Sequence, residues 1–142
     1  MVKTISKGEL DELSTELSKI IEGEVYFDDK HRSLYSTDSS PYQIKPYGVV
    51  LPKNTNDVKK VVALANKYDI AILPRGGGTS LAGQTVAEAI VLDFSKYFTN
   101  ILEFNNDEQW VKVQSGVVRD QLNKYLAPYK LQFTPDVATT SR

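Results

Sequence analysis

The stretch Ile70-Ala71-Ile72-Leu73-Pro74-Arg75-Gly76-Gly77-Gly78-Thr79-Ser80 decides the fold expected for this chain. Its first four residues are apolar and predict a buried strand, and three consecutive glycines follow closely. Glycine costs roughly 0.5–1 kcal/mol relative to alanine in regular structure, so three in a row need a backbone reason. Successive backbone N–H groups in such a loop can converge on one anion. The stretch therefore predicts a strand that ends in an anion-binding loop, with positive φ at Gly77.

The loop matches neither of two familiar phosphate-binding motifs. A Walker loop needs a glycine-lysine pair, and no lysine follows these glycines until Lys96. The dinucleotide fingerprint needs a third glycine where this sequence has Leu81. The hydroxyls of Thr79 and Ser80 add donors to the loop, while Arg75 either adds positive charge or pairs elsewhere. Taken as glycines alone, the loop can also be a plain tight turn.

The residues around the loop follow an α/β rhythm. Residues 48–51 predict a short buried strand ended by Pro52, and residues 90–93 predict another strand. Between residues 48–51 and the strand at 70–73, a helix is expected from Asn54 or Thr55 to about Tyr68. Its predicted apolar face is Val58, Val61, Val62 and Ala65. Short apolar strands separated by a helix favour a βαβ unit with parallel strands.

The flanking segments predict smaller elements. An amphipathic helix is expected over residues 7–21, with Ser6 as its N-cap and Gly23 as its stop. Residues 24–46 read as an irregular, extended loop because turn-forming residues are frequent there. Downstream we expect a hairpin of residues 101–104 and 109–114, a short helix over 118–126 ended before Pro128, and a strand fragment at 131–133.

Composition narrows the chemistry of the chain. Its 142 residues suit one domain, and the formal net charge of -1 argues against nucleic acid as the main partner. The absence of cysteine excludes disulfides and thiolate sites, and a single histidine, His31, makes a histidine metal site implausible. The sequence contains no apolar run of about 18 residues, so no membrane span is expected. The start of the chain does not resemble a signal peptide, so we expect a cytoplasmic protein.

The longer string over residues 74–84 resembles the FAD-binding domain of the vanillyl-alcohol oxidase and p-cresol methylhydroxylase (PCMH) superfamily. Within it, the glycolate oxidase and D-lactate dehydrogenase branch is most similar. Residues 32–40 resemble that branch's entry segment, residues 49–52 with the following helix its first βα unit, and residues 135–142 the start of its second flavin-contacting segment. The resemblance implies an α+β fold: a small, mainly parallel βαβ-containing sheet flanked by helices, plus a short hairpin.

The resemblance also implies which residues bind the cofactor. The loop from Arg75 to Ser80 would wrap the FAD pyrophosphate through backbone amides, and Gly83 to Thr85 would line the flavin side. Non-covalent FAD is expected, because Thr79 stands where covalent relatives carry a histidine. No catalytic residue and no metal ligand are expected in this chain. The expected cofactor-binding residues are Arg75, Gly76, Gly77, Gly78, Thr79, Ser80, Gly83, Gln84, Thr85, Pro135 and Asp136.

The activity implied is that of an FAD-dependent dehydrogenase or oxidase acting on a small, lactate- or glycolate-like 2-hydroxy acid. Hydride would pass to the flavin and onward to an iron–sulfur domain or other electron acceptor. The chain would be the N-terminal part of an FAD-binding domain, with a leading helix in residues 1–23 and a truncated FAD-binding subdomain in residues 24–142. Its partner would be the remainder of the parent flavoprotein, so alone it would be inactive and bind FAD weakly or not at all. The alternatives are a non-catalytic nucleotide- or phosphate-binding module and a folded piece that binds nothing tightly.

Overall fold

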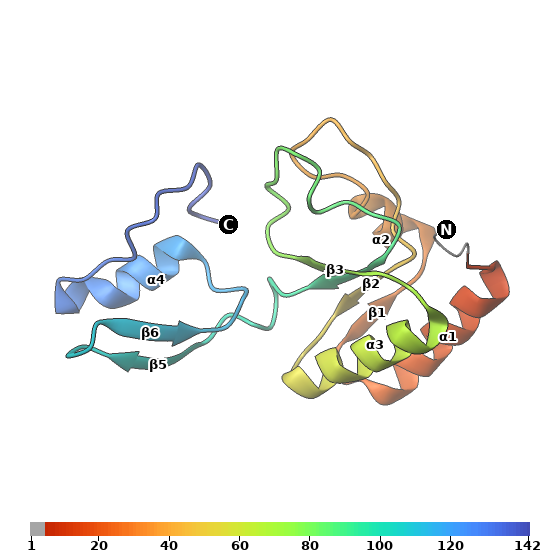
Figure 1. The fold of residues 1–142 in the computed structure, drawn as a ribbon, viewed down its shortest axis with the longest axis horizontal. Helices are drawn as coiled ribbons and strands as arrows, with labels where there is room; N and C mark the ends of the chain where they lie inside the picture. Colours follow the sequence, from red (N-terminus) through yellow and green to blue (C-terminus); the bar gives the residue numbers. More distant parts are fainter. Residues whose placement is uncertain (1–4) are drawn as a thin grey trace.

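The computed structural model describes residues 5–142, so residues 1–4 of the predicted leading segment lie outside the described part. The chain forms two lobes joined by residues 94–100 (Figure 1). The first lobe is a four-stranded sheet with helices, and the second is a hairpin with one helix. The first lobe contains α1 (Lys7–Ile20), β1 (Glu24–Tyr26), α2 (Asp29–Leu34), β2 (Gly48–Leu51), α3 (Thr55–Tyr68), β3 (Ile72–Arg75) and β4 (Ile90–Asp93). The second contains β5 (Ile101–Asn105), β6 (Trp110–Val113) and α4 (Arg119–Leu126), followed by a 3-10 turn at Ala127–Tyr129.

The first sheet has the strand order β1-β2-β4-β3. Strands β2, β4 and β3 run parallel, and β1 pairs with β2 in the antiparallel sense. The predicted βαβ unit is present, but its two strands are not neighbours, because β4 lies between them. In the pairing of β3 with β4, Arg75 lies opposite Asp93. The two strands therefore end at the same level, and the loops that follow them leave the sheet side by side.

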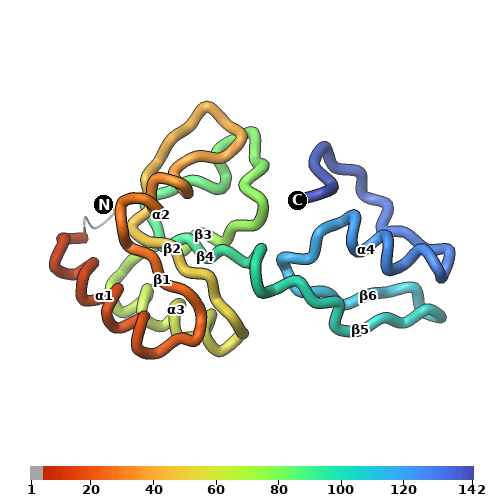
Figure 2. Tube along the Cα trace, turned by 180° about the vertical axis from the view of Figure 1, so that it is seen from behind, coloured from red at the N-terminus to blue at the C-terminus, as the bar shows by residue number. Residues whose placement is uncertain are grey.

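Both faces of the two inner strands, β2 and β4, are covered, which is why each of them begins with a continuous run of apolar or small residues. Val50 of β2 faces α1 and α3, whereas its neighbours Val49 and Leu51 face the side of α2. Figure 2 shows α1 and α3 together on one side of the strands. The core on that side consists of Leu13, Leu17, Val50, Val61, Leu64, Ala65, Ile90 and Leu92.

The main helices begin where the sequence predicts. Ser6 and Glu9 form a capping box at the start of α1, in which Glu9 Oε2 accepts from the Ser6 N–H at 2.9 Å. Asn54 caps α3 by accepting from the N–H of Asp57 at 2.9 Å. Gly23 is not the stop of α1, which already ends at Ile20. Its lack of a side chain serves a close backbone approach to the carbonyl of Leu51.

Several smaller predictions are wrong. Residues 24–46 are not one irregular loop, because they contain the three-residue β1 and the six-residue α2, both too short to give a clear periodicity. The strand expected at residues 70–73 lies at 72–75 and includes Pro74, which an edge strand tolerates. Val62 is 48% exposed, and Leu64 takes the buried position instead.

The C-terminal part of the chain also differs from one prediction. The hairpin and the helix before Pro128 are present, with the helix starting at Arg119. Residues 131–133, however, form no strand. The N–H of Phe133 donates instead to the side-chain oxygen of Asn123 in α4 at 2.8 Å. A side chain therefore takes the hydrogen bond that a strand partner would have taken.

The fully buried carboxylate of Asp57 connects three parts of the first lobe. Its oxygens accept from the backbone N–H groups of Glu22 at 3.0 Å and of Gly23 and Lys53 at 2.9 Å each. The end of α1, the start of β1 and the β2–α3 turn are thus held at one point.

We predict that Asp57→Asn lowers the free energy of unfolding by about 2 kcal/mol, because a neutral amide offers one acceptor oxygen and brings a donor among three donors. Urea denaturation measures the change. Asp69→Asn is the matched control on the same helix: Asp69 is exposed with φ 55°, a conformation that asparagine also accepts. An equal loss in both variants would contradict the assigned role of Asp57.

The lowered pKa of Glu24 in β1 leads us to predict that the stability of the fold depends on pH. Its hydrogen bond with Lys96, 2.5 Å from Nζ, and those with Tyr26 and Tyr97 lower its pKa to about 2. A pKa below that of the unfolded chain means that Glu24 stabilises the fold above about pH 4.5 and loses this contribution as the pH falls toward 2. Glu24→Gln should destabilise the protein at pH 7, and its difference from wild type should shrink over that range. Unfolding midpoints measured from pH 7 to 2, with the exposed Glu22→Gln as control, test this; a constant difference would contradict it.

Candidate functional site

A hollow of about 300 Å³ separates the two lobes at the carboxyl ends of β3 and β4. The loops after these strands form one side, the link from β6 to α4 forms another, and the C-terminal segment returns toward the gap (Figure 1). The residues that line it are Gly76, Gly77, Ser95, Ser115, Gly116, Val117, Val118 and Arg142.

The first two glycines present bare backbone to this hollow. A Cβ added to Gly76 would meet nothing within 4 Å, and the nearest atoms to one added to Gly77 would belong to Arg142, at 3.2 Å, and to the methyl of Thr79, at 3.6 Å. Within residues 5–142, no group accepts a hydrogen bond from the N–H of Gly76, Gly77, Gly78 or Thr79. Four consecutive donors are thus free to bind an anion that approaches the backbone closely.

The third glycine serves the loop itself. Positive φ occurs at Gly78 (65°) and Gly83 (73°), so the expectation of positive φ at Gly77 is wrong. A Cβ on Gly78 would overlap the guanidinium of Arg75, and one on Gly83 would come within 2.6 Å of the Tyr42 ring. These two glycines let the loop fold back over neighbouring side chains.

Arg75 does not line the hollow. Its guanidinium donates to three backbone carbonyls, those of Thr37 at 2.8 Å, Thr85 at 3.0 Å and Tyr35 at 3.3 Å. It also lies 5.2 Å from the centre of the Tyr35 ring. Of the two possibilities left open by the sequence, the structure places Arg75 in pairing with other parts of the chain.

The remaining polar residues of the loop mainly bond to one another. The Ser80 hydroxyl donates to the Gln84 side chain at 2.8 Å and accepts from the N–H groups of Ala82 and Gln84 at 3.2 Å each. Thr85 donates to Asp38 at 3.0 Å. Hydrogen bonds from Ser40 and then from Thr85 lower the pKa of Asp38 to about 2, so this carboxylate stays charged and connects the two long loops above the sheet.

The C-terminal segment reaches the hollow through its last residue. Pro135 and Asp136 are exposed and away from the lining, and Asp136 forms an ion pair of 3.4 Å with Arg119. Thr140 is held at the start of α4, where its carbonyl accepts from the N–H of Asp120 at 3.1 Å. This contact brings Arg142 against the loop that contains Gly76, Gly77 and Gly78 (the glycine loop).

Sequence reasoning missed the lining residues Ser95 and 115–118. Ser95 follows β4 and comes close to Gly76 because of the register of β3 with β4. Gly116 has no room for a side chain, since a Cβ would overlap the carbonyl of Phe94. Val118 precedes α4, gives it no side-chain cap and lines the hollow together with the glycines, while the Thr140 carbonyl accepts from the N–H of Asp120 in the first turn. Helix N-termini attract anions, and the absence of a capping side chain at Val118 was the signal in the sequence.

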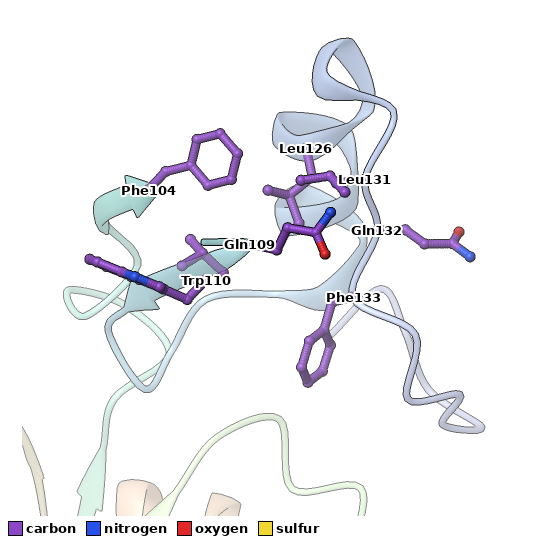
Figure 3. Close-up of a pocket in the computed structure, with 8 residues that line it drawn as sticks. Phe104, Gln109, Trp110, Leu126, Leu131, Gln132 and Phe133 are labelled. Atoms are coloured by element: carbon purple, nitrogen blue, oxygen red, sulfur yellow. The ribbon is translucent and has the colours of Figure 1, made fainter. Parts of the chain in front are cut away.

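A second hollow, of about 170 Å³, has a different character (Figure 3). It lies in the second lobe, where Phe104, Trp110, Leu126 and Phe133 surround it together with two glutamines. No ionisable side chain lines it. It therefore offers apolar packing and no acid–base chemistry.

Other candidate chemistries find no support between residues 5 and 142. The ring of His31 stacks on Tyr26 at 3.9 Å, and its Nδ1 lies 2.6 Å from Asp28. The described residues contain no group of three or more His, Cys, Asp or Glu placed to hold a metal ion. None of the described helices has the length and apolarity needed to cross a membrane.

Solved structures share this fold at low sequence identity. An alkyldihydroxyacetonephosphate synthase matches 92% of this chain and 29% of its own, with a TM-score of 0.79 and 21% identity. A p-cresol methylhydroxylase matches 92% of this chain and 27% of its own, with a TM-score of 0.72 and 18% identity. The predicted α+β architecture is thereby confirmed.

Curated relatives are closer in sequence. A D-2-hydroxyglutarate dehydrogenase from Haemophilus influenzae is 42% identical over 124 residues, and the glycolate oxidase subunit GlcD from Bacillus subtilis is 32% identical over 121 residues. These alignments cover 85% and 82% of this chain but 12% and 26% of the relatives, so the chain spans only a small part of their length. The family described as FAD binding domain matches residues 46–142. This chain therefore belongs to the FAD-binding domain family.

Proposed function

We propose that this chain forms the pyrophosphate-binding wall of an FAD site in a longer flavin-dependent dehydrogenase that oxidises a small 2-hydroxy acid. The observation that carries the proposal is the row of four backbone N–H groups from Gly76 to Thr79 without a partner in the described residues, of which Gly76 and Gly77 line the hollow. Family membership supports FAD as the ligand. Relatives named for D-2-hydroxyglutarate, D-lactate and glycolate have a 2-hydroxy acid in common, which supports the substrate class.

The residues around the hollow fit a dinucleotide pyrophosphate. Gly76 and Gly77 allow a phosphate to approach the backbone, the N-terminus of α4 lies opposite, and Arg142 supplies positive charge. When bound, FAD supplies the redox chemistry as the acceptor of hydride. The protein residues here bind and orient it, since no side chain of the lining is a carboxylate, histidine or lysine that could move a proton. Acid–base groups and the electron acceptor belong to other parts of the proposed longer protein.

Non-covalent attachment is part of the proposal. Thr79 occupies the position of the histidine that carries flavin in some relatives by resemblance, and the sequence contains no cysteine. The single histidine is engaged with Tyr26 and Asp28 and is not among the residues that line the hollow. Flavin colour that stayed with the denatured protein band would contradict this part.

A direct test uses the backbone amides as probes. NMR spectra of the 15N-labelled chain are recorded with FAD, ADP or adenosine at up to about 10 mM, a range that detects even millimolar dissociation constants. We expect FAD and ADP, which carry a pyrophosphate, to shift the amides of Gly76, Gly77 and Val118. Adenosine lacks that group and should leave them unchanged.

The same spectra separate the proposal from a simple nucleotide-binding module. FAD should also shift Gly83 and Thr85, which the proposal puts on the flavin side, whereas ADP should not. Shifts that are identical for FAD, ADP and ATP would favour the nucleotide module. The proposal commits to weak but measurable binding by this chain, so the absence of any shift of the glycine amides with all of the ligands would overturn it.

Gly76→Val gives the sharpest variant. The added side chain meets no protein atom within 4 Å at its Cβ, and φ at this residue is not in the left-handed region, so the fold should tolerate it. A phosphate approaching the N–H groups would clash with it, and the dissociation constant for ADP should rise at least about 10-fold, or 1.4 kcal/mol. Gly8→Val, at another glycine with open space around its Cβ, is the matched control. An ADP affinity that is unchanged in Gly76→Val would show that the loop does not bind the pyrophosphate.

A further inference from the structure

The network around Arg75 connects every segment that shapes the first-lobe side of the hollow. Its guanidinium donates to the carbonyls of Tyr35 and Thr37 at the start of the long segment of residues 35–47, and to the carbonyl of Thr85 in the segment of residues 76–89. Gly78 lies so close to the guanidinium that no side chain fits between them. Arg75 is thus enclosed by the two loops that it joins.

The network continues to the other loop of the hollow. The Tyr35 ring lies under the Arg75 guanidinium, and its hydroxyl donates to Asp93 at 2.5 Å. Asp93 is buried at the end of β4, and its second oxygen accepts from the N–H of Ser95 at 2.8 Å. Ser95 lines the hollow. One chain of contacts therefore runs from the glycine loop to the loop after β4.

The direction of the Arg75 side chain decides whether this residue binds phosphate or holds the loops in place. A cation that binds phosphate must have donors toward the hollow, yet Arg75 is not among the lining residues, and its two terminal nitrogens donate to three backbone carbonyls. Arg142 is the charged residue of the lining. The planar fork of arginine suits several fixed acceptors at once, which the single ammonium of lysine does not match.

We propose that Arg75, with Tyr35 and Asp93, is a positioning residue that holds the glycine loop and Ser95 in their binding geometry before any ligand arrives. Arg142, by contrast, is the residue that contributes charge to the ligand. The part concerning ligand affinity rests on the proposed function, whereas the part concerning loop geometry does not. The three glycines accordingly divide their roles: Gly76 and Gly77 leave room for the ligand, and Gly78 leaves room for Arg75.

Hydrogen exchange of the ligand-free chain tests the loop geometry. Arg75→Met and Arg75→Lys should both accelerate exchange at least about 10-fold for the amides of Ile44 and Thr85, which bond to Ser36 and Asp38 within the joined loops. Amides of the β2–β4 pairing should keep their rates, which shows that the variants are folded. Arg142→Met should leave the exchange of both loops unchanged. Exchange rates of the Ile44 and Thr85 amides that are the same in Arg75→Lys as in the wild type would overturn the proposal.

Tyr35→Phe provides a second, milder variant. It retains the ring under Arg75 and loses only the hydrogen bond to Asp93. We expect faster exchange of the Ser95 amide with little change at Thr85. Equal effects at both amides would show general loosening and contradict the described order of contacts.

Measurements of ADP affinity at two salt concentrations complete the test. ADP titrations of wild type, Arg75→Met and Arg142→Met are compared at about 50 and 500 mM salt, where screening weakens direct charge contacts. The loss of affinity in Arg75→Met should be the same at both concentrations, whereas that in Arg142→Met should shrink at high salt. A loss in Arg75→Met that disappears at high salt would make Arg75 a phosphate ligand and overturn the proposal. Failure of wild type to bind ADP or FAD would instead refute the proposed function and leave the exchange result standing.

Discussion

The parallel pairing of β3 with β4, with Arg75 opposite Asp93, is the interaction on which the candidate site depends. It makes both strands end at one level, so the glycine loop and the loop that carries Ser95 begin next to each other. The same register puts Arg75 and Asp93 next to each other on neighbouring strands, and Tyr35 contacts both. A change of register would separate the two loops and break the contacts between them.

Around this pairing, the chain uses polar groups to hold segments that its small apolar core does not reach. Asp57 joins α1, β1 and α3 through three backbone N–H groups, and Asp38 joins the two long loops through Ser40 and Thr85. Each carboxylate is matched by donors, as a partly or fully buried charge requires. The glycine loop differs because its donors remain unmatched, and this contrast marks it as a place for an external anion.

The sequence predicts the regular elements well because their apolar residues recur with clear periods. The four apolar residues of β2, the capped α3 and the glycines after β3 all have direct sequence signals, and the resemblance identified the family. The short β1 and α2 were missed because three and six residues cannot show a period. The lining residues Ser95 and Val118 could not be found from local patterns, since strand register and the folding back of the second lobe bring them to the loop. Likewise, nothing near Arg75 in the sequence indicates that its acceptors are the carbonyls of residues 35 and 37.

The position of β4 between β2 and β3 has a consequence for how the molecule assembles. Strand β3 has no partner other than β4, and residues 76–89 separate the two strands in the sequence. Pairing of β4 with β3 therefore closes the glycine-rich segment into a loop, at an entropic cost. Completion of the sheet and formation of the loop are consequently one event, so the pathway by which the protein folds also builds its anion-binding backbone.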